Sequence, residues 1–463
     1  MTESEKLLNQ LAGRLGAKTI HELRQVARAV GVKCPAAGKK ERLVEDCLGI
    51  AAGKINPVPK KADGGLVGAP PKSHEYDRQL VTDILACREK LNIVCPAAEE
   101  EAESIALTVN SGNAHLLDFT AEGILEKSAE LWFMRTGLAD TRKDIFVNEK
   151  LVNRYGLREG DVLCGRCVRE EVDEIAGLAT VTSVNGGSPE NASNRKKFDN
   201  LIPVYPDKRF VTAFGADDVA GRMLDLFAPV GAGQLAFITG DRGSGKSEFL
   251  KNVASGIAKN NAEVKLVLLL IDVRAEQAAD YKRSFPKAKI FSSALGCDES
   301  NHVRCARLAS EHAKRLAEQS KDAVIILDGL TELARAYNCS AGRVYTALDT
   351  SALNSAKKFV SVARNTQDGG SVTIISSLCT GGDAVDEAVF SGLKGACNMR
   401  VEVAEKYADA PFDIYASYAS DDKRLLSESE FKAAVKLRSQ GTGDAFLKTR
   451  SNKELCALLN DKN

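Results

Sequence analysis

One glycine-rich segment has the residue types and spacing of a phosphate-binding loop. It reads Gly240-Asp-Arg-Gly-Ser-Gly-Lys-Ser247 and lies between an apolar run, 235–239, and a segment with helical spacing. Glycines let backbone N–H groups curl around phosphate oxygens, and the N-terminus of the following helix adds positive potential. In such a loop Lys246 reaches the outer phosphates and Ser247 ligates Mg²⁺. The segment predicts a nucleotide site, for ATP with Mg²⁺, rather than a flexible glycine turn. Its candidate residues are Gly240, Asp241, Arg242, Gly243, Ser244, Gly245, Lys246, Ser247 and Glu248.

A nucleotide site of this kind needs an acid that holds Mg²⁺ through water at the end of a buried strand. Asp328 follows Val324-Ile-Ile-Leu327 and has this form. The alternative is an aspartate that ends the strand and caps a helix, but the loop upstream favours the magnesium role. Asp272 ends the apolar run 266–271 in the same way. It either orients water or a neighbouring group, or caps a helix.

The elements that must position these residues alternate between strand and helix over the last 240 or so residues. Apolar runs predict buried strands, and longer segments with helical spacing predict helices between them. This alternation indicates a mainly parallel sheet with helices on both faces. The predicted strands are 235–239, 266–271, 288–291, 323–327 and 372–378, and the predicted helices include 247–259, 299–319 and 350–364.

The sequence before this core predicts two further domains. Residues 1–75 hold 13 basic and 8 acidic residues, and segments 20–29 and 39–48 have helical spacing. Residues 51–74 are rich in Gly, Pro, Lys and Ala and are typical of a linker. Short alternating runs between 114 and 185 indicate a small antiparallel barrel. We therefore expect a basic helical domain at 1–50, a linker and charged helical segment at 51–113, a barrel at 114–186, a connector at 187–221 and a P-loop domain at 222–463.

Composition limits the class of protein. The chain has 463 residues, 63 basic and 63 acidic, so its formal net charge is zero, and 44% of its residues are hydrophobic. No apolar run approaches the roughly 18 residues that span a bilayer. The first residues, Met-Thr-Glu-Ser-Glu-Lys, lack the layout of a secretory signal. We expect a cytoplasmic protein with no membrane partner and with its 12 cysteines reduced.

Several segments together resemble the Rho family of transcription termination factors, over roughly residues 114–440. The basic helical segment 1–50 is similar in kind to the small N-terminal domain of that family. The matching segments are Pro189-Glu-Asn-Ala-Ser-Asn194, Asn200-Leu-Ile-Pro203, 221–234, Leu269-Leu-Ile-Asp272, 322–328, Leu333-Ala-Arg-Ala-Tyr-Asn338, Ala363-Arg-Asn365 and Lys394-Gly-Ala-Cys-Asn-Met399.

The resemblance implies a hexameric, ring-forming motor with a RecA-like core. It also implies an OB-type cold-shock barrel that binds single-stranded RNA, and RNA polymerase as a partner. The family's base-stacking strand corresponds to Leu131-Trp-Phe-Met-Arg135. Alternate residues share a strand face, so Phe133 keeps one stacking aromatic while Leu131 replaces the other. Arg135 belongs to the same face, and Trp132 points to the opposite one, where core packing competes with RNA contact.

Two loops of the family grip RNA inside the ring. Gly342-Arg343-Val344 and Lys394-Gly395 match them, so Arg343 and Lys394 could neutralise phosphates. As isolated cations they would be ordinary surface residues.

The chain departs from the family at the end of one strand. The family reads Asp-Glu-Arg there and its glutamate activates the attacking water, whereas this chain reads Asp272-Val273-Arg274. Valine cannot accept or orient a proton. Glu276 is the only replacement nearby in sequence, one helical turn away.

Three further family residues are replaced around the nucleotide. An extra P-loop lysine is Gly243 here, with Arg242 a partial substitute, and the trans-acting arginine finger corresponds to Ser420. Lys423 and Arg424 lie close enough in sequence for either to take the finger's role. The adenine-stacking aromatic corresponds to about Asp409, with Tyr407 two residues away.

Three functional hypotheses follow. The first is a Rho-type RNA-stimulated ATPase and helicase in transcription termination, with impaired turnover. The second is a catalytically degenerate Rho paralogue that binds RNA and nucleotide as a regulatory or structural subunit. The third, a rotary ATP synthase subunit, shares the RecA-like core but does not explain the barrel or the basic N-terminus. On the first hypothesis, Lys246, Asp328, Asp272 and Arg274 are the catalytic candidates.

Overall fold

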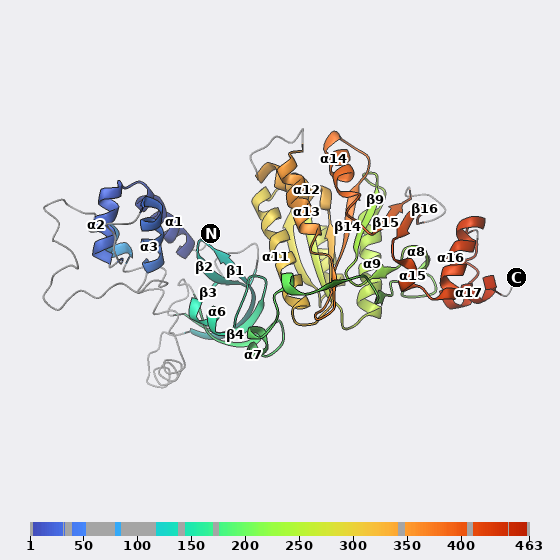
Figure 1. The fold of residues 1–463 in the computed structure, drawn as a ribbon, viewed down its shortest axis with the longest axis horizontal. Coiled ribbons are helices and arrows are strands. Elements are labelled where there is room, and N and C mark those ends of the chain that lie inside the picture. The colour runs from blue at the N-terminus through green and yellow to red at the C-terminus, as the bar shows by residue number, and fades with distance from the viewer. Residues whose placement is uncertain are drawn as a thin grey trace. The chain divides into compact units, whose positions relative to one another are not determined.

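The computed structural model describes residues 3–30, 32, 39–51, 79–84, 117–137, 144–169, 176–340, 348–404, 411–442 and 444–460 (Figure 1). The chain divides into two compact units, residues 1–194 and 195–463. The predicted fold class is confirmed: N-terminal helices precede a closed barrel, and a mainly parallel α/β core follows.

The first unit begins with three helices, α1 (Glu3–Gly16), α2 (Ile20–Val30) and α3 (Lys40–Ala51). The two predicted helices correspond to α2 and α3. The sequence favours a helical hairpin or a three-helix unit here, and the structure has three helices because α1 precedes them. Thr19 and Glu22 begin α2 with a reciprocal cap, since the Thr19 N–H donates to the Glu22 carboxylate and the Glu22 N–H donates to Thr19 Oγ1. Leu23, Val26 and Val30 then form a buried apolar stripe on this helix.

The barrel of the first unit has five strands, β1 (Leu117–Ser128), β2 (Leu131–Arg135), β3 (Ile145–Val147), β4 (Val162–Arg169) and β5 (Gly177–Val184). They close in the order β1-β2-β3-β5-β4, and only the β3–β5 pair is parallel. Leu125, Met134 and Leu178 belong to its buried core. Because side chains alternate along a strand, Leu131 and Phe133 point away from that core. The helix α6 (Glu149–Arg154) follows β3, and α7 (Pro189–Ser193) follows β5.

The second unit is built on a seven-stranded sheet with the order β11-β10-β12-β14-β9-β15-β16. All neighbours are parallel except β15 and β16. Central strands are buried on both faces, which is why they read as continuous apolar runs. All five predicted strands are confirmed, with slightly different ends. The strands are β9 (Leu235–Gly240), β10 (Lys265–Val273), β11 (Lys289–Ala294), β12 (Ala323–Asp328), β14 (Val372–Cys379), β15 (Met399–Val403) and β16 (Phe412–Ala419).

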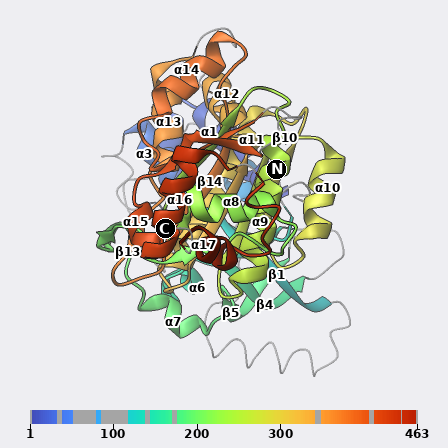
Figure 2. The same cartoon turned by 90° about the vertical axis from the view of Figure 1, so that its right-hand side faces the viewer.

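Helices cover both faces of this sheet. Figure 1 shows α11, α12 and α13 on one face and α8 and α9 on the other, and Figure 2 turns the second face toward the viewer. The predicted helices are confirmed as α9, α11 and α13. The helices of this unit are α8 (Val219–Phe227), α9 (Lys246–Asn260), α10 (Ala275–Ser284), α11 (Glu299–Ala317), α12 (Leu330–Ser340), α13 (Thr350–Val360), α14 (Ala384–Leu393), α15 (Asp422–Leu425), α16 (Glu428–Gln440) and α17 (Asn452–Asn460).

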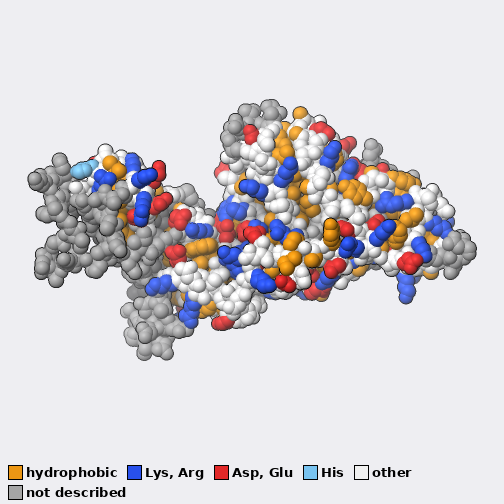
Figure 3. Space-filling view, viewed as in Figure 1, with side chains coloured by type: hydrophobic (Ala, Val, Ile, Leu, Met, Phe, Trp, Pro, Cys, Tyr) orange, Lys and Arg blue, Asp and Glu red, His pale blue; other side chains and the backbone are white. Residues whose placement is uncertain are grey.

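Short elements complete the second unit. A 3₁₀ turn spans Phe198–Asn200, β6 (Pro203–Val204) pairs with β13 (Asn365–Thr366), and β7 (Arg209–Phe210) pairs with β8 (Val230–Gly231). The connector segment therefore contributes strands to the second unit. On the face drawn in Figure 3, basic and acidic side chains are intermixed over this unit. No helix among the described residues is long and apolar enough to cross a membrane.

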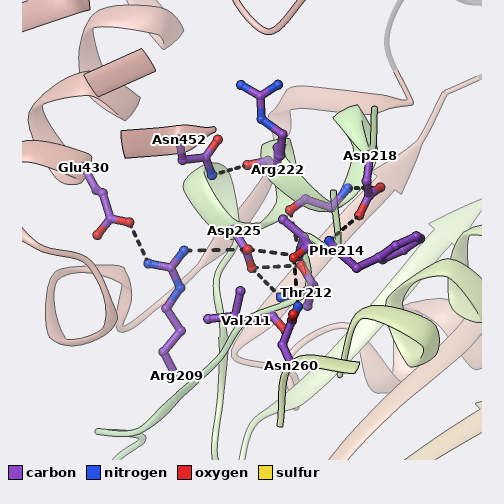
Figure 4. Close-up of polar contacts among 12 residues, drawn as sticks. Arg209, Val211, Thr212, Phe214, Asp218, Arg222, Asp225, Asn260, Glu430 and Asn452 are labelled. Carbon is purple, nitrogen blue, oxygen red and sulfur yellow. Dashed lines mark hydrogen bonds and ion pairs between the residues drawn. The ribbon is translucent and has the colours of Figure 1, made fainter. Parts of the chain in front are cut away.

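A buried carboxylate holds the start of the core together (Figure 4). Asp225 on α8 accepts hydrogen bonds from the Thr212 N–H at 2.9 Å, the Thr212 hydroxyl at 2.8 Å and the Ala213 N–H at 3.1 Å. On the same helix, the Arg222 guanidinium donates to the carbonyl oxygens of Phe446 and Thr449. Both groups are almost fully buried. They tie the segment before α8 and the C-terminal helices to the core.

Asp225→Ala should lower the free energy of unfolding of the second unit by about 3 kcal/mol. It leaves the donors of Thr212 and Ala213 buried without an acceptor, and hydrogen bonds to a charged group are the strong ones. Thermal or denaturant unfolding measures the change. Asp217→Ala, at an exposed position five residues before Arg222, is the matched control and should change stability little. Equal stability of the two variants would contradict the role of Asp225.

Candidate functional site

The predicted phosphate-binding loop joins β9 to α9 at the C-terminal edge of the sheet. Gly240, Gly243 and Gly245 have φ angles of 151°, 83° and 95°. Residues with a side chain rarely adopt these values, so the loop requires glycine there. The Lys246 side chain is buried, and its ammonium donates to the carbonyl oxygens of Gly240, at 2.9 Å, and Asp241. A cation therefore lies inside the loop that is predicted to hold phosphate.

Asp328 lies at the end of β12, and only β14 separates this strand from β9. The Ser377 hydroxyl donates to Asp328 Oδ1 at 2.8 Å, which orients the carboxylate. Ser247 is the second residue of α9, directly after Lys246. A hydroxyl and a carboxylate at one edge of the sheet fit the oxygen ligands that Mg²⁺ prefers.

An ion-pair network connects the loop to two helices. Arg242 binds Asp386 of α14 through Nε and Nη2, at distances of 2.8–3.0 Å. Asp386 is fully buried and also accepts a hydrogen bond from Arg335 of α12, which pairs with Asp383 as well. The structure thus places the Arg242 guanidinium on a carboxylate 144 residues away in sequence. This ion pair does not test the hypothesis that Arg242 replaces the family's extra lysine.

The end of β10 carries Asp272, Val273 and Arg274, whose side chains lie in different environments. Asp272 is exposed and has a φ of 57°, and Arg274 is exposed at the start of α10. Val273 is only 7% exposed and belongs to the main hydrophobic core of the unit. Glu276 is exposed in the first turn of α10. Val273 therefore provides packing, and its side chain has no group that could act on water.

A second carboxylate beside the nucleotide loop was missed by the sequence argument. Glu332 lies in the first turn of α12, and a Cβ atom added to Gly329 would collide with its Oε2 atom. Burial raises its pKa, and the negative charges of Asp328 and Asp386 act in the same direction. Its own backbone N–H and Arg242 act in the opposite direction. The sequence did hold one indication of Glu332: it lies four residues after Asp328, about one helical turn further along the chain.

The outer face of the barrel carries an aromatic pair. Phe133 and Phe146 have ring centroids 6.1 Å apart in an edge-to-face arrangement. The Arg135 guanidinium lies 4.8 Å from the Phe133 ring and forms ion pairs with Glu126, at 2.8 Å, and with Asp144. The sequence argument identified Phe133 and Arg135 but missed Phe146 and Asp144. Phe146 lies in the short strand β3 and Asp144 just before it, and nothing local to either residue indicates that it meets Phe133 or Arg135 of β2.

The structure corrects one expectation for this face. Phe133 was expected to offer its ring to RNA bases, but the side chain is fully buried. It shares a hydrophobic cluster with Leu131, Phe146, residues of α1, α2 and α3, and Leu80 and Ile84 of the segment 79–84. Tertiary packing, which strand alternation does not reveal, covers the ring.

Trp132 lies as predicted on the opposite face of β2. Its half-buried ring packs against the barrel core, and the Lys127 ammonium lies 5.9 Å from the ring centroid. Core packing is therefore the role that the structure gives Trp132.

Of the two predicted pore cations, Lys394 is described. It is exposed at the C-terminal end of α14, with its ammonium 5.8 Å from the Phe390 ring. Arg343, with its neighbours Gly342 and Val344, lies outside the described residues. The same is true of Tyr407 and Asp409.

The predicted position of the arginine finger lies just after β16. Ser420 is exposed, and its N–H donates to the Asn398 carbonyl oxygen at 2.8 Å. Lys423 and Arg424 are also exposed and lie over aromatic rings of the same chain, Phe431 at 5.3 Å and Tyr205 at 5.0 Å. Both aromatic partners lie outside the P-loop, residues 240–247.

The fold and site define a P-loop protein of the RecA-like class with a separate five-stranded barrel. The model of the ATP synthase alpha/beta family nucleotide-binding domain matches residues 221–419, and that of the Rho termination factor RNA-binding domain matches residues 121–190. Transcription termination factor Rho of Cereibacter sphaeroides is 34% identical over 406 residues, 82% of this chain and 96% of the relative.

Two further relatives with the same name give similar values. The Rho of Pseudomonas fluorescens biotype C is 34% identical over 79% of this chain and 91% of its own length, and that of Bacillus subtilis (strain 168) is 32% identical over 82% and 93%. The chain belongs to the Rho family of transcription termination factors. The family resemblance seen in the sequence is confirmed.

Proposed function

We propose that this protein binds ATP with Mg²⁺ in its P-loop and single-stranded RNA on its barrel, and that it acts in transcription termination in the cytoplasm. The observation that carries the proposal is the buried Lys246 ammonium inside a glycine loop whose φ angles only glycine adopts readily. Asp328, fixed by Ser377 at the same edge of the sheet, supplies the acid that a magnesium site needs.

The family relationship supports the remaining parts of this proposal. The relatives are named as transcription termination factors, and the barrel matches their RNA-binding domain. We propose a homohexameric ring with RNA polymerase as a partner. Lys394 and Arg343 would contact RNA phosphates in its pore, where each neutralised phosphate contributes to a salt-dependent affinity.

We also propose that ATP hydrolysis is slow and is not stimulated by RNA. Val273 is packed in the core, and Ser420 has no charge to offer a neighbouring subunit. A general base typically contributes ~10²–10⁴-fold to a rate, and an arginine finger ~10³–10⁵-fold. Both act in the transition state, so their replacement affects kcat rather than ATP affinity.

The second candidate function is a degenerate paralogue that binds RNA and nucleotide as a regulatory or structural subunit. The burial of Val273 is the observation that favours it. Single-turnover and steady-state ATPase assays with and without poly-pyrimidine RNA separate the two functions. RNA-stimulated turnover supports the motor, whereas nucleotide binding without turnover supports the paralogue.

RNA binding by the barrel can be tested on a fragment covering residues 114–186. The fragment omits the N-terminal helices, whose side chains share the cluster with Phe133. It should bind single-stranded RNA in a salt-dependent way. Because removal of the helices takes away part of the cluster that covers Phe133 in the full chain, Phe133→Ala should weaken RNA binding by this fragment by about 1–3 kcal/mol. Fluorescence anisotropy with a labelled oligo-pyrimidine measures both effects.

The Phe133 test needs a control for folding, since removing a ring from a packed cluster also destabilises a domain. Circular dichroism should show that the variant barrel is folded at the temperature of the binding assay. A folded wild-type fragment that ignores RNA at low salt would mean that the barrel is only a scaffold.

A further inference from the structure

The P-loop site lacks an identified base, since Val273 stands at the position of the family's glutamate. Val273 is buried in the apolar core, and Glu276 is exposed on α10. We propose that Glu332 is the general base that accepts the proton of the attacking water. This inference rests on the proposed function, because it requires ATP at the P-loop.

The first support is position. Glu332 follows Asp328 by one helical turn, and its carboxylate folds back over Gly329, the residue directly after that aspartate. Gly329 in turn adjoins the Ser377 hydroxyl that orients Asp328. The carboxylate is therefore at the C-terminal edge of β12, where Asp328 itself lies. Arg242 of the P-loop and Asp386 are close enough to act on its charge.

The second support is the lack of another task for this carboxylate. Among the described residues, no side chain donates a hydrogen bond to the Glu332 carboxylate. Arg242 and Arg335 are both bound to Asp386 instead. An acid in the first turn of a helix is favourable when it is exposed. Glu332 is half-buried, and a poorly paired carboxylate in such a place costs free energy.

The third support is proton affinity. Burial raises the pKa of Glu332 above the ordinary value of a glutamate. A base is most effective when its pKa lies near the working pH, and enzymes raise the pKa of carboxylates by burial for this purpose. Burial acts on the pKa of Glu332 in this direction.

The chemical step needs no reagent other than ATP and one water molecule. A water oxygen forms a bond to the γ-phosphorus of ATP, and one water proton passes to the Glu332 carboxylate. The bond from the γ-phosphorus to the β,γ-bridging oxygen breaks, and its electron pair leaves with ADP. The products are ADP and inorganic phosphate, and Glu332 afterwards releases the proton to solvent. Because no arginine finger assists the step, this route accounts for slow turnover.

The test compares Glu332→Gln with the unmodified full chain in two measurements. Equilibrium binding of a fluorescent ATP analogue with Mg²⁺ should stay within about threefold, because a base acts in the transition state. Single-turnover hydrolysis should fall about 100-fold or more. Glu387→Gln, an exposed acid in the first turn of α14, is the control.

The outcomes separate this inference from the proposed function. Failure of the unmodified chain to bind ATP overturns both. If a folded Glu332→Gln variant binds ATP and hydrolyses it at an unchanged rate, only the role of Glu332 is overturned. The same holds if the unmodified chain binds ATP but does not hydrolyse it. A large loss of ATP–Mg²⁺ affinity would mark Glu332 as a metal-binding group instead. Loss of hydrolysis in Glu276→Gln rather than Glu332→Gln would assign the base to α10.

Discussion

Lys246→Ala is expected to abolish the binding of ATP–Mg²⁺. The Lys246 ammonium is the cation inside the P-loop, where the two carbonyl oxygens of Gly240 and Asp241 hold it. In a loop of this kind it reaches the β- and γ-phosphates, so its removal takes away the main positive charge opposite them. Isothermal titration calorimetry with ATP and Mg²⁺ measures the loss directly.

Lys259→Ala provides the matched control for that experiment. Lys259 is an exposed lysine in the last turn of the same helix, α9, and its ammonium lies 4.0 Å from the Phe214 ring. Its replacement removes the same charge from the same helix but leaves the loop intact. Affinity for ATP should be retained. If Lys246→Ala bound ATP as tightly as this control, the assignment of the nucleotide site would be wrong.

The double change Val273→Glu with Ser420→Arg should raise kcat far more than either single change. Val273→Glu restores a carboxylate at the end of β10, and Ser420→Arg restores a cation at an exposed position after β16. Each single variant leaves the other barrier in place, so the double variant should gain the product of the two rate factors. From typical magnitudes, each restored group is worth at least about 100-fold. Steady-state ATPase assays of all four proteins, with and without poly-pyrimidine RNA, measure the effect.

Folding must be followed in the same series, because Val273 is 7% exposed and packs in the core. A glutamate there is expected to lower stability, so melting temperatures should accompany the rates. ATP affinity should change little across the four proteins. Brisk RNA-stimulated turnover by the unmodified protein would contradict the prediction, since Glu276 with Lys423 or Arg424 would then have taken over both roles.

The sequence by itself determined the features that depend on neighbouring residues. The P-loop could be located because strand, glycine turn, lysine and helix follow one another within about twenty residues of chain. The central strands β9, β10, β12 and β14 could be located because strands buried on both faces are nearly continuous apolar runs, and Asp328 could be identified because it ends one of them. The direction of Trp132 toward the barrel core followed from strand alternation alone.

Only the tertiary structure decided which distant side chains meet. Nothing local to Phe133 indicates that residues near positions 80 and 84 belong to its cluster, and nothing local to Arg242 indicates Asp386. Val273 stands where the family has its catalytic glutamate, and only the tertiary structure shows that this valine also packs in the core. Glu332 became a candidate base only when its carboxylate was found folded over Gly329 beside Asp328. Burial and long-range ion pairs arise when elements distant in sequence pack together. The spacing of residues along the chain does not determine which of these elements meet.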